Sequence, residues 1–229
     1  GVITEGLSGT IEGVMKAGDA DFSVAQAGSA DVVLSFLEEK HYQLISSQEG
    51  VEKAVGVLIS IIPIERNPYF VLIGLSRDNL EVANMNIIEG RPYSKENEIL
   101  LGKVAASNFD KSVGDTIEIN QKEFSIVGIY ETGNTMQDGG AAMELNQLQK
   151  WQNLEGKVSL IFVKVKAGYD IQKTAQAIED NSGGDLVTIV DLEDYEAIDQ
   201  GMKIMDALTW VISILAIVIG GVGVMNTIL

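Results

Sequence analysis

The sequence predicts an α+β protein that ends in a membrane-spanning helix, and three observations lead to this fold class. Residues 207–229 are apolar and contain no charged side chain. Residues 19–190 alternate between short strand-like and helix-like segments. The elements that open this region find matching partners only near its end, which indicates that a second unit is inserted between two halves of the first.

The predicted membrane helix reads ALTWVISILAIVIGGVGVMNTIL. As a helix it would be roughly 35 Å long, enough to cross a hydrocarbon core of about 30 Å with some tilt. A buried helix of a soluble core usually keeps a polar stripe, so that alternative is disfavoured. Gly220, Gly221 and Gly223 would let a second helix approach closely, and Asn226 would add an interhelical hydrogen bond. Local flexibility near a membrane face explains these glycines equally well.

Two segments are predicted to form a helical stalk. Residues 1–18 carry an apolar stripe, although their glycines weaken a helix. Residues 191–206 begin with Asp191, a suitable N-cap, and continue without a strong helix stop into the membrane run. The apolar residues of this second segment follow the 3-4-3 spacing of a two-helix seam: Tyr195, Ile198, Met202 and Met205.

Region 19–85 opens a small α+β unit. Its expected elements are a strand at 21–27, a surface helix at 35–47, a strand at 53–66, a turn at 66–68 and a strand at 69–75. Val and Ile favour the strand at 53–66, and Pro63 indicates that this strand ends or reaches a sheet edge there.

Region 156–190 supplies the missing part of that unit. Its expected elements are a strand at 158–166, a helix at 171–180 with Asp170 as N-cap, a turn at 181–184 and a strand at 186–190. This succession fits either a βαβ crossover or a split, ferredoxin-like half. The sequence leaves this choice open.

Region 86–155 is predicted to be the insertion. Its expected elements are a strand at 98–101, a helix at 103–109, a hairpin of strands 116–119 and 124–130, a loop at 132–140 and a helix at 145–154. Trp151, on the last helix, is expected to anchor a core or a subdomain interface rather than to stack on a ligand.

Composition excludes several function classes. The 16 Lys and Arg against 33 Asp and Glu give a net charge of -17, which repels phosphate backbones and disfavours nucleic-acid binding. The absence of cysteine excludes disulfides and thiolate metal sites, and a single histidine makes a typical zinc site improbable.

Catalytic motifs are also absent from the sequence. No GxSxG nucleophile elbow occurs, and His41 is expected to be a solvated or capping residue rather than a catalytic base. Asp138 with Glu144 could be drawn as a general acid and base, but such pairs arise by chance among so many acids. No catalytic, cofactor-binding or metal-binding residue is therefore predicted.

Several motifs resemble a known family of membrane proteins. The string GGVGVMNTIL at 220–229 resembles the second membrane helix of MacB and FtsX-like permeases. The succession EGRPYS, NEILLGKVAA, VGDTIEI, FSIVGIYETG and GAAMELNQLQKW, from 89 to 151, is similar in order and spacing to the inserted subdomain of MacB-like extracytoplasmic domains. Residues 21–81 resemble the family in arrangement more than in letters.

The resemblance implies a division of the chain into subdomains. Residues 19–85 and 156–190 would form a porter-like subdomain, and 86–155 an inserted sabre-like subdomain. The stalk would consist of 1–18, following a first membrane helix outside this chain, and 191–206, and residues 207–229 would be the next membrane helix.

The resemblance also implies a function and a set of partners. The chain would be a non-catalytic part of a multi-pass permease in the cell membrane, with its large domain outside the cytoplasm. The permease would form a homodimer in lipid and join an ABC ATPase subunit that binds ATP and Mg, so the chain itself needs no cofactor. A membrane fusion protein is a partner in part of the family, and the sequence decides neither this partner nor the substrate.

Two competing functions follow from the same sequence. A membrane-tethered sensor or adhesion domain would bind a ligand and need no ATPase partner. A membrane-anchored hydrolase is less favoured, because the catalytic motifs are missing.

Overall fold

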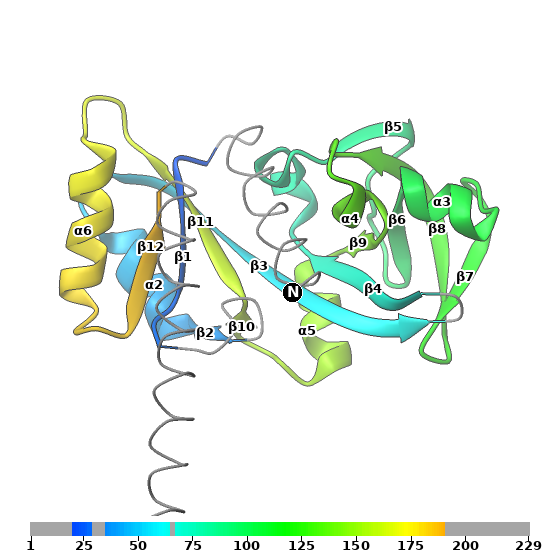
Figure 1. Cartoon of the computed structure of the whole chain (residues 1–229), viewed down its shortest axis with the longest axis horizontal. Coiled ribbons are helices and arrows are strands. Elements are labelled where there is room, and N and C mark those ends of the chain that lie inside the picture. Colours follow the sequence, from blue (N-terminus) through cyan, green and yellow to red (C-terminus); the bar gives the residue numbers. More distant parts are fainter. Residues whose placement is uncertain (1–19, 29–34, 65–66, 191–229) are drawn as a thin grey trace, which may run out of the picture. The chain divides into compact units, whose positions relative to one another are not determined.

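A ten-stranded sheet forms the frame of the computed structural model, which describes residues 20–28, 35–64 and 67–190 (Figure 1). The strand order is β12-β1-β11-β3-β4-β9-β6-β8-β5, with β7 pairing with β8. The predicted stalk and membrane helix, 1–18 and 191–229, lie outside the described residues. Within the described ranges, no helix is long and apolar enough to cross a membrane.

The first part of the sheet has ferredoxin-like topology. Its elements are β1 (Phe22–Gln26), α2 (Glu39–Ser47), β3 (Val51–Ile64), β11 (Leu160–Val165), α6 (Ile171–Asn181) and β12 (Leu186–Ile189). Strand β1 lies between β11 and β12 and is antiparallel to both. Strand β11 in turn lies between β1 and β3. The segment β11-α6-β12 is therefore a split unit rather than a plain crossover.

Helices α2 and α6 pack on this part of the sheet. Phe22 and Val24 of β1 alternate with Ser23 and contact a cluster that includes Ile45 of α2 and Ile178 of α6. All four apolar residues are completely buried. Helix α6 begins as predicted, because Asp170 Oδ1 accepts a hydrogen bond from the Lys173 backbone N–H at 2.8 Å.

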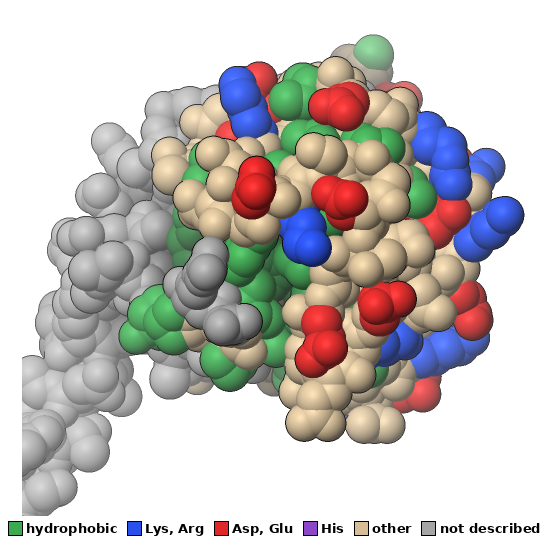
Figure 2. Space-filling model, turned by 90° about the vertical axis from the view of Figure 1, so that its right-hand side faces the viewer, with side chains coloured by type: hydrophobic (Ala, Val, Ile, Leu, Met, Phe, Trp, Pro, Cys, Tyr) green, Lys and Arg blue, Asp and Glu red, His purple; other side chains and the backbone are tan. Residues whose placement is uncertain are grey.

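The second part of the sheet contains the predicted insertion. Its elements are β4 (Asn67–Gly74), η1 (Arg77–Ala83), β5 (Asn86–Gly90), β6 (Glu98–Gly102), α3 (Lys103–Phe109), β7 (Thr116–Ile119), β8 (Lys122–Glu131), α4 (Thr135–Asp138), β9 (Ala141–Met143) and α5 (Leu145–Gln152). Strands β4 and β9 are parallel, as are β6 and β8. On the face shown in Figure 2, positively and negatively charged side chains are interspersed, so no continuous basic stripe lies there.

A second hydrophobic core lies under this part of the sheet. It joins Leu58 of β3 and Leu72 of β4 to Ile99 of β6, Phe124 of β8 and Leu148 of α5. All five side chains are fully buried. Strand β3 contributes Val51 to the first core and Leu58 to the second, so one strand connects both cores.

The predicted hairpin is confirmed as β7-β8, although its second strand begins at Lys122 rather than at residue 124. Ile119 pairs with Lys122, which leaves a loop of Asn120 and Gln121. Both loop residues have positive φ, 49° and 64°. This combination is that of a type I′ turn, whose twist matches the twist of the two strands.

Several predicted boundaries differ from the structure, and three of them are instructive. The helix expected from residue 35 begins at Glu39, because Leu37 and Glu38 form β2 (Leu37–Glu38), which pairs with β10 (Lys157–Val158). The strand expected at 158–166 is interrupted at Ser159. The backbone N–H of Ser159 donates to Val57 O, and its buried hydroxyl accepts from the Ile59 N–H at 3.0 Å. The strand expected from residue 69 begins earlier, because Asn67, assigned from sequence to the turn, already pairs with Ile64.

Candidate interaction site

His41 caps a helix instead of serving as a base. Its Nδ1 accepts a hydrogen bond from the Glu38 backbone N–H at 3.0 Å, at the start of α2. The side chain is buried, so of the two expected roles the capping role is confirmed and the solvated one is wrong. Burial and the neighbouring Lys40 lower the pKa of His41 below its ordinary value. The ring is therefore neutral near pH 7, as an acceptor at Nδ1 must be.

Asp138 and Glu144 each hold a backbone turn. Asp138 is buried, and its Oδ1 accepts from both the backbone N–H and the hydroxyl of Thr132 at 2.7 Å. Glu144 Oε2 accepts from the Arg77 backbone N–H at 3.2 Å. These contacts give both carboxylates a structural role without any acid–base pairing. In the described ranges, no group of three or more His, Cys, Asp or Glu residues could hold a metal ion.

Trp151 packs on a core, as the sequence predicts. Its ring centroid lies 5.1 Å from that of Phe124, and the two planes are inclined by 57°. Lys122 Nζ lies 5.6 Å from the Trp151 centroid and 5.3 Å from that of Phe124. The tryptophan thus joins α5 to the β7-β8 hairpin and leaves no open aromatic platform.

The motifs EGRPYS and NEILLGKVAA meet in one ion pair, in which Glu98 is buried and Arg91 is half exposed. Arg91 Nη1 and Nη2 donate to the two carboxylate oxygens of Glu98 at 2.9 and 2.6 Å. The backbone N–H groups of Ser94 and Lys95 donate to Glu98 Oε2 at 2.8 and 3.1 Å. The Arg91 guanidinium, aided by these N–H groups, lowers the pKa of Glu98 to about 2. These two motifs of the family resemblance therefore have a structural role: they hold the 91–98 loop in one conformation.

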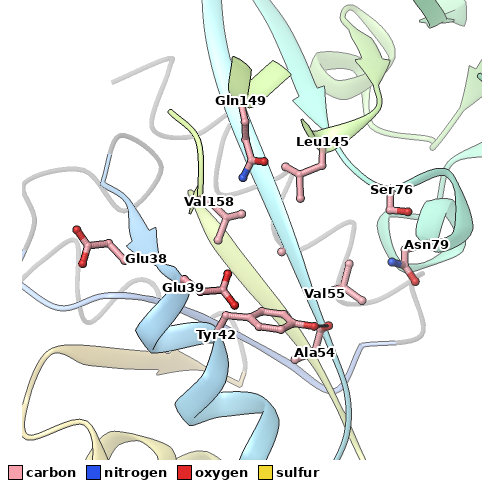
Figure 3. Close-up of a pocket in the computed structure, with 12 residues that line it drawn as sticks. Glu38, Glu39, Tyr42, Ala54, Val55, Ser76, Asn79, Leu145, Gln149 and Val158 are labelled. Carbon is pink, nitrogen blue, oxygen red and sulfur yellow. Dashed lines mark hydrogen bonds between the residues drawn. The ribbon is translucent and has the colours of Figure 1, made fainter. Parts of the chain in front are cut away.

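An open cleft of about 300 Å³ lies where α2, α5, β3 and β10 come together (Figure 3). Its lining residues come from five separate stretches of the chain: Glu38, Glu39, Tyr42, Ala54, Val55, Gly56, Ser76, Asn79, Leu145, Gln149, Gly156 and Val158. Gly56 is required at its base, since a Cβ there would lie 2.9 Å from Val158 Cγ1. The close approach of β3 and β10 thus defines the bottom of the cleft.

Two polar side chains of this cleft are already hydrogen-bonded to the backbone. Tyr42 extends toward Ala54, and its hydroxyl donates to the Ala54 carbonyl at 3.2 Å (Figure 3). Gln149 Nε2 donates to Lys157 O at 2.8 Å. The lining holds two carboxylates, two hydroxyls and two side-chain amides, but no histidine, lysine or arginine.

The residues singled out as sites from the sequence lie outside the described part of the chain. These are the helix-packing residues Gly220, Gly221, Gly223 and Asn226, and the stalk-seam residues Tyr195, Ile198, Met202 and Met205. Both sets remain predictions. The cleft, in contrast, was not foreseen, because no local pattern relates Tyr42 to Leu145.

Comparison with known proteins gives a family and a relative of known description. The family model described as MacB-like periplasmic core domain matches residues 1–181. A relative from Methanocaldococcus jannaschii, described as an uncharacterized ABC transporter permease, is 28% identical over 243 residues. The match covers 94% of this chain but only 59% of the relative.

Two solved structures share the fold. The periplasmic region of MacB from Actinobacillus actinomycetemcomitans has a TM-score of 0.59 at 11% identity, covering 80% of this chain and 94% of that one. The extracellular domain of the ABC-type transporter YknZ from Gram-positive bacteria has a TM-score of 0.56 at 15% identity. That match covers 73% of this chain and 98% of the other. At such identities the likeness concerns the fold alone.

Proposed function

Because this chain belongs to the family of MacB-like periplasmic core domains, we propose that it is the extracytoplasmic domain and adjoining membrane helix of an ABC transporter permease. The family model matches most of the chain, and the Methanocaldococcus relative that aligns with nearly all of it is described as such a permease. The uncharged run at 207–229 supplies the membrane helix in this proposal. The large domain would lie outside the cytoplasm.

The role we propose is mechanical. Closure of the ATPase would tilt the stalk, 1–18 and 191–206, and the domain would convert that tilt into movement outside the membrane. The observation that carries this role is β3, whose 14 residues are continuous through both hydrophobic cores. At about 3.3 Å per residue this strand spans roughly 46 Å. A displacement of one hydrophobic core would therefore be transmitted through β3 to the other.

The partners are those that the family resemblance implies. We propose that ATP and Mg bind to an ABC ATPase subunit and not to the residues of this sequence, which hold no nucleotide-binding motif. A homodimer of permeases would bring two stalks together along the seam of Tyr195, Ile198, Met202 and Met205. A membrane fusion protein would extend the assembly where the cell has an outer membrane.

The test uses the full-length permease in its native membrane. An ABC ATPase should co-purify with it. Ile198→Pro should leave ATP hydrolysis measurable but abolish the coupled export, because proline breaks the predicted stalk helix. The matched control is Ile198→Ala, which keeps the helix and should retain most of the coupling.

Two results would overturn the proposal. Consistent absence of an ATPase from the purified complex would favour a tethered sensor or adhesion domain. Unaltered coupling in Ile198→Pro would exclude the stalk as the transmitting element.

A further inference from the structure

We propose that His41 is an acid-sensitive cap of α2: a proton on its ring releases the first turn of this helix and, with it, one wall of the cleft shown in Figure 3. Glu38, Glu39 and Tyr42 of that wall lie in or next to this turn. The proposal is independent of the transport role. It rests on one accepting nitrogen, one buried donor and one nearby carboxylate.

The accepting nitrogen is Nδ1 of His41, which takes the hydrogen bond from the Glu38 backbone N–H at 3.0 Å. Glu38 is the N-cap residue, and His41 is the third residue of the helix, where glutamate or glutamine usually supplies this acceptor. Unlike those side chains, imidazole loses its only acceptor when it is protonated, because both nitrogens then carry hydrogen. A protonated His41 would therefore leave the Glu38 N–H without its partner.

The buried donor is the other ring nitrogen, Nε2. It carries the hydrogen of the neutral ring, since Nδ1 accepts, and it has no hydrogen-bond partner among the residues that the structure describes. Asp185 Oδ2, in the turn before β12, lies 4.0 Å away, which is too far for a hydrogen bond. A positive charge on the ring would be attracted toward this carboxylate and away from the Glu38 backbone. The two charge states of His41 thus prefer different positions of the ring.

The charged groups around the ring act in opposite directions. Burial has the largest effect and lowers the pKa of His41, Lys40 lowers it further, and Asp185 and Glu38 raise it. Lys157 of β10 lies opposite Glu38 in the β2-β10 ladder, and the N-terminal end of a helix also disfavours a cation. The net pKa is lowered, so the unfolded chain, with a pKa of about 6.5, takes up the proton first. The stabilisation is therefore complete above about pH 6.5 and is lost as the pH falls toward the folded pKa.

The release would be confined to the first turn of α2. Leu37 before the turn and Ile45 after it are both completely buried in the first hydrophobic core. Between them, β2 contributes only two residues, which pair with β10. Loss of the His41 contact would therefore loosen the Glu38–Tyr42 segment while the core keeps both of its ends in place.

The test follows the ring and the cap in one titration by nuclear magnetic resonance. His41 is the only histidine, so ¹⁵N labelling of histidine gives a single imidazole in the full 229-residue chain in detergent micelles. Between pH 7.5 and pH 5 we expect this ring to change from the Nε2–H tautomer to the cation, with a midpoint below about 6.5. The Glu38 backbone amide signal should shift with the same midpoint. The Lys173 amide, which Asp170 caps in α6, is the internal control and should not follow it.

His41→Gln is the matched variant. Glutamine keeps an acceptor at this position and gains no charge in this pH range, so the Glu38 amide should no longer respond to pH. Hydrogen exchange at the Tyr42 amide, whose acceptor in an α-helix is the Glu38 carbonyl, reports opening of the turn. Its protection should fall about fivefold in the acid form of the wild type, as expected for the loss of one cap, and should not fall in the variant.

Three results would overturn the proposal. The first is a Glu38 amide that does not follow the imidazole, and the second is an equal shift of that amide in His41→Gln. The third is a His41 midpoint at or above the ordinary pKa of histidine, since the cap would then not oppose protonation. If His41→Gln does not fold, the comparison of the two midpoints in the wild type decides.

Discussion

Glu98 shows how much of the 91–98 loop depends on one carboxylate. It accepts five hydrogen bonds, from Arg91, Ser94 and Lys95, although its side chain is only 10% exposed. Glu98→Gln removes the charge and leaves part of this donor set unsatisfied. We expect the free energy of unfolding to fall by about 2 kcal/mol. Chemical denaturation measures the loss, and Glu52→Gln, an exposed residue of β3, should change stability by less than about 0.5 kcal/mol.

The same residue gives this prediction a pH dependence. The pKa of Glu98 is lowered from 4.5 to about 2 in the folded protein, chiefly by the hydrogen bonds from Arg91. An acid with a lowered pKa stabilises the fold above its unfolded pKa, and that stabilisation is lost as the pH falls toward the folded value. The stability difference between wild type and Glu98→Gln should therefore be constant above about pH 5 and shrink between about pH 4.5 and pH 2. A stability difference that does not change with pH would contradict this role of the ionised Glu98 carboxylate.

Single residues were the hardest feature to predict from sequence. His41 is flanked by Lys40 and Tyr42, both of them at least one-third exposed, so the local pattern indicates a surface position. It is buried because β2 and the 185 region cover the start of α2, and Asp185 Oδ2 lies 4.0 Å from His41 Nε2. The ion pair of Arg91 and Glu98 could not be predicted from sequence either, since two charged residues seven positions apart in a loop follow no helix or strand period.

At the scale of elements, sequence patterns predicted the bounds of a helix or strand correctly where one face of it is buried and the other exposed. The strand 116–119 and the helix 103–109 have the predicted bounds, because Ile117 and Ile119 alternate with exposed residues and α3 buries its alanines. Strand β5 was missed because its residues are mostly exposed and do not alternate. Strand β9 was missed because three small or flexible apolar residues carry no clear period. Both strands exist because neighbouring strands pair with them.

The β7-β8 turn permits an element-scale prediction. Gln121 has φ 64°, a left-handed conformation that is strained for any residue with a Cβ and free for glycine. Gln121→Gly should raise the free energy of unfolding by about 0.5–1 kcal/mol, since Asn-Gly is the preferred type I′ pair. Thermal denaturation measures the gain. Gln121→Ala keeps the strain and should not stabilise the protein, so equal gains from both variants would exclude the conformational explanation.

At the scale of the whole molecule, the sequence indicated a divided sheet but not its order. The expected elements at 21–75 and 158–190 do pair, through β1 with β11 and β11 with β3. The parallel pairing of β4 with β9 joins Leu72 to Ala141 and depends on long-range packing that no local window records. The predicted subdomain boundaries at 85, 86, 155 and 156 stay predictions, because one sheet runs through both regions.

The orientation of the domain is the remaining whole-molecule prediction, since charge alone does not decide it. The chain contains no cysteine, so a single introduced thiol is a unique label. Lys173→Cys, on the exposed face of α6, should react with a membrane-impermeant maleimide in intact spheroplasts if the domain lies outside the cytoplasm. Ala175→Cys, at a position only 1% exposed, should react only after denaturation and shows that labelling reports access. Labelling of Lys173→Cys only after the membrane is permeabilised would place the domain in the cytoplasm, where a stalk could not transmit ATP-driven motion outward.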